Sequence, residues 1–336
     1  KKLDLIKQNN IISKLDFKLT KDQIKTLNEI NIDLTSNQKM FRLLQGDVGS
    51  GKTIVALISA FNVINSGFQV AVMAPTEILA RQHFNLAKKL FGSSINIDLL
   101  SSKSEIKDKK RILTDLYNHN LNLIFGTHSI FQKKVEFKNL GLIIIDEQHK
   151  FGVNQRKKLS DKGGVNCDVL LMSATPIPRT LTMTIYGDMD LSIIKEKPKS
   201  RKEVKTYTKL ESKVKDVIKF IKKEIKQGNQ VFWVCPLIEE SKKIDHTSAI
   251  VKYKFLEKIF PKKVALLHGK TEPEKKELIL NNFLNRNYDI LVSTTIIEVG
   301  IDFPNANIII VEDSNKFGLS QLHQLRGRVG RGKKQS

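Results

Sequence analysis

Leu43-Leu44-Gln45-Gly46-Asp47-Val48-Gly49-Ser50-Gly51-Lys52-Thr53 is the stretch that decides the fold of this chain. It contains a short apolar run and a glycine-rich loop that ends in a lysine and a threonine. An apolar segment with helical periodicity follows over residues 54–64. This order predicts a strand, a phosphate-binding loop and a helix.

The loop matches the pattern G-x-x-x-x-G-K-[ST]. Glycines in such a loop let successive backbone N–H groups surround a phosphate, and the following helix adds its positive N-terminus. We expect Lys52 to contact the β- and γ-phosphates and Thr53 to offer its hydroxyl to Mg²⁺. A chance glycine-rich turn is the alternative, and the flanking strand and helix weigh against it. The nucleotide contacts predicted from the loop are Gly46, Asp47, Gly49, Ser50, Gly51, Lys52 and Thr53.

Length and composition indicate a soluble globular protein. The chain has 336 residues, 40% of them hydrophobic and 27% charged, which suits two domains of ordinary size. No apolar run approaches the roughly 18–20 residues of a membrane span, and the Lys-rich start lacks the apolar core of a signal peptide. We therefore expect a cytoplasmic protein with no membrane partner. Because residue 1 is a lysine, we also expect the sequence to be a fragment.

The cysteine and histidine content indicates neither disulfides nor a zinc site. Cys167 and Cys235 are the two cysteines, and they lie far apart in the sequence. The seven histidines show no ligand spacing. The net charge of +22 favours a polyanionic partner, but a coding bias toward lysine explains the charge equally well.

The hydrophobic pattern predicts an α/β chain with two parallel-sheet domains. Residues 1–16 resemble the end of a preceding segment, and Thr20 then caps a helix. We expect a first domain over 17–195, a polar linker over 196–205 and a second domain over 206–336. In the first domain, strands are expected at 41–44, 69–74, 97–100, 121–125, 142–145 and 169–172, and helices at 52–65, 76–90 and 105–118. In the second domain, strands are expected at 204–208, 231–234, 264–267, 290–292 and 308–311, and helices at 214–226 and 274–283.

Two adjacent carboxylates end the apolar strand at 142–145. At the end of a buried strand, Asp146 can hold Mg²⁺ through water, and Glu147 can reach an attacking water as general base. Acidic residues at a strand end are more often a helix cap. A phosphate loop earlier in the same domain favours the catalytic interpretation.

The segment 321–331, Gln-Leu-His-Gln-Leu-Arg-Gly-Arg-Val-Gly-Arg, concentrates arginine. A guanidinium is planar and always charged, so it suits stabilisation of the γ-phosphate as it leaves. A basic helix end that binds nucleic acid phosphate is an equal alternative for this segment alone.

Taken together, these motifs resemble those of the superfamily 2 helicases, and the resemblance spans roughly residues 17–332. The matching segments, in order, are 46–53, 74–77, 126–128, 146–149, 173–175, 293–302 and 324–331. Within the superfamily, the segments 146–153, 176–180, 234–241 and 317–324 are most similar to bacterial helicases that remodel replication forks. The transcription-repair coupling factor is the second resemblance.

The resemblance implies two tandem RecA-like domains with a P-loop NTPase site, using ATP and Mg²⁺. It assigns adenine recognition to Phe17 and Gln23, catalysis to Lys52, Glu147, Gln324, Arg328 and Arg331, and metal binding to Thr53 and Asp146. It assigns DNA contacts to Pro75, Thr76, Thr127 and Thr294.

The activity that the resemblance implies is ATP-driven translocation on double-stranded DNA, with regression of stalled forks and branch migration of Holliday junctions in recombination and repair. The implied partners are branched and double-stranded DNA and a single-stranded DNA-binding protein, and the implied state is a monomer. Two other functions stay open: an ATP-responsive DNA-binding module without motor activity, and an RNA helicase.

Overall fold

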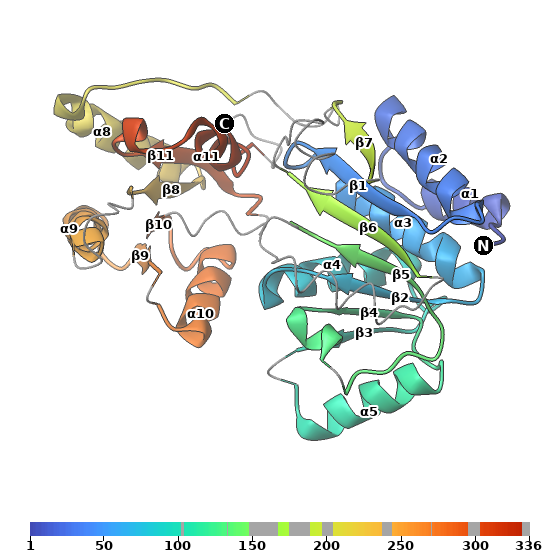
Figure 1. The fold of residues 1–336 in the computed structure, drawn as a ribbon. Helices are drawn as coiled ribbons and strands as arrows, with labels where there is room; N and C mark the ends of the chain where they lie inside the picture. Colours follow the sequence, from blue (N-terminus) through green and yellow to red (C-terminus); the bar gives the residue numbers. More distant parts are fainter. Residues whose placement is uncertain are drawn as a thin grey trace. The chain divides into compact units, whose positions relative to one another are not determined.

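The chain folds as two compact units, Lys1–Pro198 and Lys199–Ser336, each built on its own sheet in this computed structural model (Figure 1). The structure describes residues 1–101, 104–132, 134–147, 167–174, 189–196, 204–236, 244–269, 271–294 and 303–330. The division between the units falls inside the range 196–205 that the sequence predicts as the linker, although 197–203 lie outside the described residues.

A seven-stranded parallel sheet forms the centre of unit 1, in the order β3-β4-β2-β5-β6-β1-β7. Each neighbouring pair is parallel, so the carboxyl ends of these strands meet at one edge of the sheet. The strands are β1 (Phe41–Gly46), β2 (Gln69–Met73), β3 (Ile97–Leu100), β4 (Leu123–Gly126), β5 (Leu140–Ile145), β6 (Asp168–Ser173) and β7 (Asp190–Ile194). Loops at that edge are where an α/β sheet binds its ligands.

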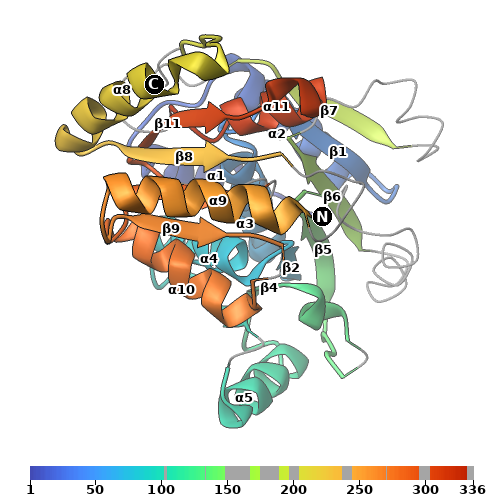
Figure 2. The same cartoon turned by 90° about the vertical axis from the view of Figure 1, so that its left-hand side faces the viewer.

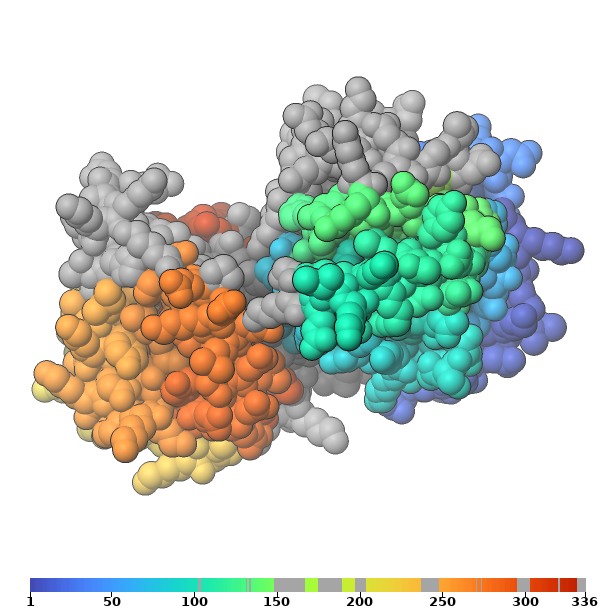
Figure 3. All heavy atoms as spheres, turned by 90° about the horizontal axis from the view of Figure 1, so that it is seen from below, coloured from blue at the N-terminus to red at the C-terminus, as the bar shows by residue number. Residues whose placement is uncertain are grey.

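Helices cover both faces of this sheet. They are α1 (Leu5–Ser13), α2 (Lys21–Thr35), α3 (Lys52–Asn65), α4 (Glu77–Phe91) and α5 (Ile106–Tyr117), with a 3₁₀ turn η1 (His128–Phe131). Alternation along β2 shows the two faces: Val70 and Val72 pack into the core under α1 to α4, while Ala71 and Met73 pack into the core under α5. Helix α5 itself lies at the surface of unit 1 (Figure 3).

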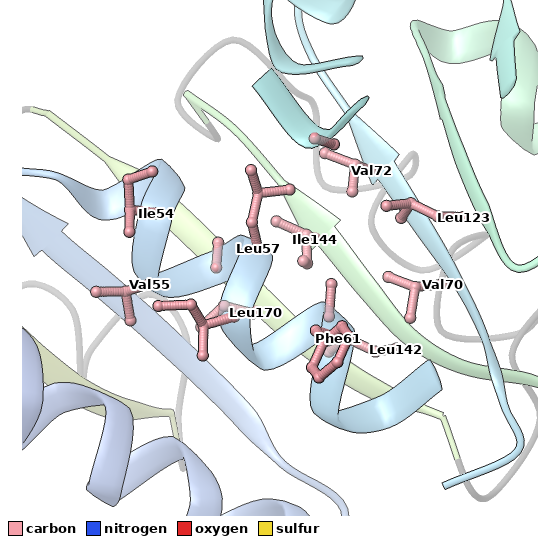
Figure 4. Packing of buried hydrophobic residues seen from close by; sticks show 14 of the residues in the cluster. Ile54, Val55, Leu57, Phe61, Val70, Val72, Leu123, Leu142, Ile144 and Leu170 are labelled. Carbon is pink, nitrogen blue, oxygen red and sulfur yellow. The ribbon is translucent and has the colours of Figure 1, made fainter. Parts of the chain in front are cut away.

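Helix α3 is buried along most of its length, including its apolar positions from Ile54 to Val63. Figure 4 shows Leu57 and Phe61 of α3 packed against Ile144, Leu142 and neighbouring strand residues. Each fully buried aliphatic side chain contributes about 1.5–3 kcal/mol to folding. This packing fixes the start of α3, and with it the loop that precedes the helix.

Residues 1–16, which the sequence assigns to a preceding segment, pack within unit 1. Asp4 caps α1 by accepting hydrogen bonds from the Ile6 and Lys7 amides. Gln8 is buried, and its Oε1 accepts from the side-chain amides of Asn31 at 2.8 Å and Asn62 at 2.6 Å. These bonds fix α1 to α2 and α3, because a buried amide without partners would cost about 1–3 kcal/mol.

Unit 2 has a four-stranded parallel sheet in the order β11-β8-β10-β9. Its elements are η3 (Glu211–Lys213), α8 (Val214–Lys226), β8 (Gln230–Val234), α9 (Ile244–Ile259), β9 (Val264–Leu267), α10 (Pro273–Leu284), β10 (Ile290–Ser293), β11 (Ala306–Val311), η5 (Ser314–Lys316) and α11 (Leu319–Arg326). Trp233 packs with α8 and α9 on one face, and Figure 2 shows α9 lying along this sheet. On the other face, Phe232 packs against Phe283 of α10, with ring centroids 5.4 Å apart.

The predicted parallel α/β architecture is confirmed, and 52–65, 97–100, 214–226 and 264–267 match the observed elements end to end. The strand predicted at 204–208 is wrong: residues 204–210 form no strand, and only Val204 is partly buried there. Alternation alone makes no strand where no neighbouring strand pairs with it. Strand β7 and helix α9 were not predicted. None of the helices in the described ranges is long and apolar enough to cross a membrane.

Burial of both thiols gives a test of the fold. Cys167 and Cys235 are fully buried, and burial is the main cause that raises the pKa of each thiol to about 12. Because only the thiolate is nucleophilic, neither thiol should react with Ellman's reagent at pH 8 in the native protein. Both should react in guanidinium chloride. Rapid reaction of either thiol in the native state would contradict the burial of these cysteines.

Candidate nucleotide and DNA site

The loop between β1 and α3 turns on two glycines in the left-handed region, Gly49 with φ of 78° and Gly51 with φ of 87°. Side-chain-bearing residues adopt that conformation at a cost of about 1–2 kcal/mol. Gly46 ends β1 where an added Cβ would lie 3.0 Å from the Ile194 carbonyl oxygen. The glycines of the motif therefore fit the backbone that the structure gives them.

Gln23 is 1% exposed and connects helix α2 to the loop. Its Oε1 accepts a hydrogen bond from the Thr20 amide at 2.9 Å, and its Nε2 donates to the Ser50 carbonyl oxygen at 2.8 Å. Thr20 and Gln23 also form the capping box that begins α2. The predicted cap is confirmed. The side-chain amide of Gln23, which the resemblance assigns to adenine recognition, also bonds to the backbone of the loop.

Lys52 is the first residue of α3, and its side chain bonds to the loop that precedes the helix. It is 8% exposed, and its Nζ donates to the carbonyl oxygens of Gly46 at 2.8 Å and Asp47 at 3.1 Å. Among the described residues, the buried Ser50 hydroxyl has no hydrogen-bond partner. A buried ammonium and an orphaned hydroxyl at a helix N-terminus suit an anion with several acceptor oxygens.

Asp146 follows β5 at the same edge of the sheet, and its amide donates to the Met73 carbonyl oxygen at 2.9 Å. Its Oδ1 accepts from the Glu147 amide at 2.9 Å, and its Oδ2 lies 2.8 Å from His83 Nε2. Burial by itself would raise the pKa of Asp146. The hydrogen bond and charge of His83, the charge of Lys52 and the Glu147 amide outweigh burial, so this pKa lies below its ordinary value and the carboxylate is ionised.

Glu147 has a φ of 50°, which is unusual for a residue other than glycine, asparagine or aspartate. Its side chain is buried, with 7% of the residue exposed. Strained backbone of this kind persists where the surrounding structure holds it, and it is concentrated at functional sites.

Of the other predicted residues of unit 1, Thr53, Pro75, Thr76 and Thr127 come after strands that end at the same edge. Phe17 is 48% exposed. Thr53 is the second residue of α3, Thr76 caps α4, and Thr127 precedes η1 after β4. Pro75, like Thr76 and Thr127, is only partly buried.

In unit 2, Thr294 follows β10 at the carboxyl edge of the second sheet and is 3% exposed. Its hydroxyl has no hydrogen-bond partner among the described residues. Gln324 lies on α11, and Arg328 follows that helix and is 3% exposed. Arg331 lies outside the described residues.

The residues that the structure brings together fit ATP and Mg²⁺. The loop offers amide donors and an ammonium for phosphates, and Asp146 offers an ionised carboxylate. Within the described ranges, no three His, Cys, Asp or Glu side chains cluster as ligands for a metal. Carboxylate and hydroxyl oxygens, such as those of Asp146 and Thr53, suit Mg²⁺, which keeps several waters and takes few protein ligands.

His83 is the residue near the site that the sequence did not predict. A single histidine on the apolar face of a helix has no motif spacing. The one available indication is its position two helical turns after the Thr76 cap. This position predicts a contact with Asp146 only when β5 is known to pair with β2.

Comparison with known proteins agrees with this geometry. Residues 20–184 match the DEAD/DEAH box helicase family, and residues 212–333 match the helicase conserved C-terminal domain. A solved structure of the DEAD-box helicase Mss116 bound to ssRNA superposes with a TM-score of 0.69 over 99% of this chain and 72% of that chain, at 20% identity. That likeness concerns the fold. The fold and the two family matches define a two-domain chain of the superfamily 2 helicases.

More similar proteins narrow the class. The chain is 52% identical to the ATP-dependent DNA helicase RecG of Aquifex aeolicus and 49% identical to that of Bacillus subtilis, over 97% of this chain in both cases. A solved structure of RecG bound to a three-way DNA junction superposes with a TM-score of 0.87 at 43% identity, covering 99% of this chain. The chain belongs to the RecG family. It spans 41% and 48% of the length of the two curated relatives and 44% of the chain in the solved structure.

A glycine substitution tests the loop. In Gly51→Ala, the new Cβ would overlap Gln23 Nε2 at a φ of 87°, so the bond from Gln23 to Ser50 would break. We expect ATP affinity, measured with a fluorescent ATP analogue, to fall at least about tenfold, since a distorted loop loses at least one backbone N–H bond to a charged phosphate, which is worth about 1.5–3 kcal/mol.

Gly67→Ala is the matched control. Gly67 has a φ of 84°, and no neighbouring atom lies within 4 Å of its added Cβ. It should lose about the same 1–2 kcal/mol of stability without losing nucleotide affinity. Equal nucleotide affinity in both variants would refute the role given to the loop.

Proposed function

We propose that this chain is the ATP-driven motor of a DNA helicase that moves along double-stranded DNA and remodels branched DNA. One observation carries the ATPase part: the Lys52 ammonium, bonded to the Gly46 carbonyl oxygen at the end of β1, and the Asp146 carboxylate, just after β5, lie at the same carboxyl edge of the parallel sheet. A phosphate-binding cation and a metal-binding carboxylate thus share one sheet edge. The relatives of this chain are named ATP-dependent DNA helicase RecG, and this name supports ATP and DNA as the substrates.

In this proposal, Gln23 and Phe17 bind the adenine, and the loop from Gly46 to Thr53 binds the phosphates. Lys52 would exchange its bonds to the loop carbonyls for phosphate oxygens. Thr53 and Asp146 would hold Mg²⁺, which when bound neutralises phosphate charge. Glu147 would orient the attacking water and accept its proton.

Unit 2 would supply Gln324, Arg328 and Arg331 to the γ-phosphate. The burial of Arg328 supports this role, because a guanidinium fixed within a fold is pre-organised for an anion. A site completed from two domains would tie hydrolysis to their relative movement.

DNA would lie against Pro75, Thr76 and Thr127 of unit 1 and Thr294 of unit 2. Helix N-termini and hydroxyls are good donors to phosphate, and Thr76 and Thr127 each precede a helical turn. The net charge of +22 favours the same polyanion. DNA as substrate would place the protein in the bacterial cytoplasm.

Branched DNA is the substrate that the likeness to RecG supports, because the related RecG structure is that of a complex with a three-way junction. We infer that stalled forks and Holliday junctions are remodelled during recombination and repair. The proposal also includes a monomeric motor and a single-stranded DNA-binding protein as a partner.

Glu147→Gln tests the general base. The amide keeps the size of the side chain but cannot accept the proton, so hydrolysis should fall about 10²–10⁴-fold while ATP still binds. Phosphate release and nucleotide binding measure the two effects separately. Glu105→Gln, an exposed position before α5, is the control and should keep full activity. Normal phosphate release by Glu147→Gln would exclude Glu147 as the base.

Substrate choice is tested by measuring ATP hydrolysis with linear duplex DNA, forked DNA and RNA. We expect both DNAs to stimulate hydrolysis, forked DNA to be remodelled, and RNA to have little effect. Stronger stimulation by RNA would identify an RNA helicase instead. ATP binding without stimulation by any nucleic acid would identify a module without motor activity.

A further inference from the structure

The pair of His83 and Asp146 joins helix α4 to the end of strand β5. His83 is 6% exposed, and its Nε2 lies 2.8 Å from Asp146 Oδ2. Because the carboxylate is ionised and can only accept, the Nε2–H group is the donor. The other carboxylate oxygen accepts from the Glu147 amide. Each oxygen thus has one protein donor and keeps a lone pair for another ligand.

The two partners come from elements that lie side by side in the sheet. Strand β2 leads into α4 and pairs with β5, and Met73 of β2 accepts the hydrogen bond of the Asp146 amide. The helix starts at the Thr76 cap, where the hydroxyl accepts from the Leu79 amide at 3.4 Å. His83 lies about two turns further on, so it is on the same side of α4 as the cap.

Because helix α4 is continuous and packed along one face, a displacement of its N-terminus would also displace His83. Leu79, Ala80 and Ala87 are buried in the core of unit 1, and the region between Thr76 and His83 is continuous helix. A helix held by its hydrogen bonds and a close-packed face moves as a rigid rod over two turns. The segment 75–76 at its N-terminus is the one assigned to DNA.

A buried histidine that serves only for packing could donate its N–H group to any acceptor nearby. Here the acceptor is the carboxylate assigned to the metal, and this carboxylate carries both the His83 bond and the Glu147 amide bond. Partners that orient the ligand of a metal in this way change metal affinity by about 10–100-fold when they are removed.

We propose that His83 is a positioning residue that fixes the orientation of Asp146 toward Mg²⁺ and transmits to it the position of the N-terminus of α4. This inference rests on the proposed function, because it takes Asp146 as the metal-binding carboxylate and 75–76 as a DNA contact. In this inference His83 acts through Asp146 and not on the nucleotide itself.

The test compares His83→Leu and His83→Gln in the full-length protein. Leucine removes the donor and keeps an apolar side chain of similar bulk, whereas glutamine keeps an N–H donor. The readout is the Mg²⁺ concentration needed for tight binding of a fluorescent, non-hydrolysable ATP analogue. We expect His83→Leu to need at least about tenfold more Mg²⁺, and His83→Gln to stay close to the unsubstituted protein.

Asn85→Ala is the matched control, because Asn85 lies two positions further along α4 and is exposed. It should leave the Mg²⁺ requirement unchanged. Thermal unfolding of each variant shows whether the protein is folded at the temperature of the binding assay. If His83→Leu does not fold, His83→Asn replaces it, because the shorter amide keeps polarity but falls short of Asp146.

A double-substitution cycle separates positioning from general support of the fold. If His83 acts through Asp146, then His83→Leu should add no further loss of Mg²⁺-dependent binding to an Asp146→Asn background. A structural role would lower Mg²⁺-dependent binding by the same factor in both backgrounds. Duplex DNA should also stimulate hydrolysis less in His83→Leu than in His83→Gln.

An unchanged Mg²⁺ requirement in folded His83→Leu would overturn the inference, as would equal behaviour of the leucine and glutamine variants. Failure of the proposed function looks different: the unsubstituted protein itself would then bind no nucleotide in a Mg²⁺-dependent way.

Discussion

The parallel pairing of β2, β5, β6 and β1 is the constraint on which the rest of unit 1 depends. Parallel strands end at the same edge, so the loop after Gly46, the carboxylates at Asp146 and Glu147 and the cap of α4 at Thr76 converge without being neighbours in the sequence. The bond from the Asp146 amide to the Met73 carbonyl oxygen continues this register past the last residue of β5. The buried helix α3 then holds the phosphate loop against that edge.

Polar groups near this edge are held by other protein groups. Gln23 supports the loop backbone, the loop carbonyls hold the Lys52 ammonium, and His83 holds Asp146. A pre-oriented group loses little freedom when its ligand arrives, and buried polar groups are costly if they are left unmatched. The site therefore combines side chains held rigidly by other protein groups with donors and acceptors that phosphate and Mg²⁺ would bind.

Much of the site could be predicted because local patterns carry its chemistry. The glycines of the loop are needed for its left-handed turns, and Thr20 with Gln23 forms a capping box from adjacent residues. Other features could not be predicted. The strand expected at 204–208 lacks a neighbour to pair with, and no pattern within residues 1–16 shows that Gln8 bonds to Asn31 and Asn62. Such contacts join residues that are close only after folding.

The sequence by itself determined the α/β class, the phosphate loop, the carboxylates after β5 and the family resemblance, because each depends on residue types at short, fixed spacing. Only the tertiary structure decided that Gln23 supports the Ser50 carbonyl, that α1 belongs to the first unit, and that His83 reaches Asp146. The physical reason is that sheet order and helix packing bring distant segments into contact. A histidine two turns into a helix acquires its partner from the neighbouring strand, which its own segment does not specify.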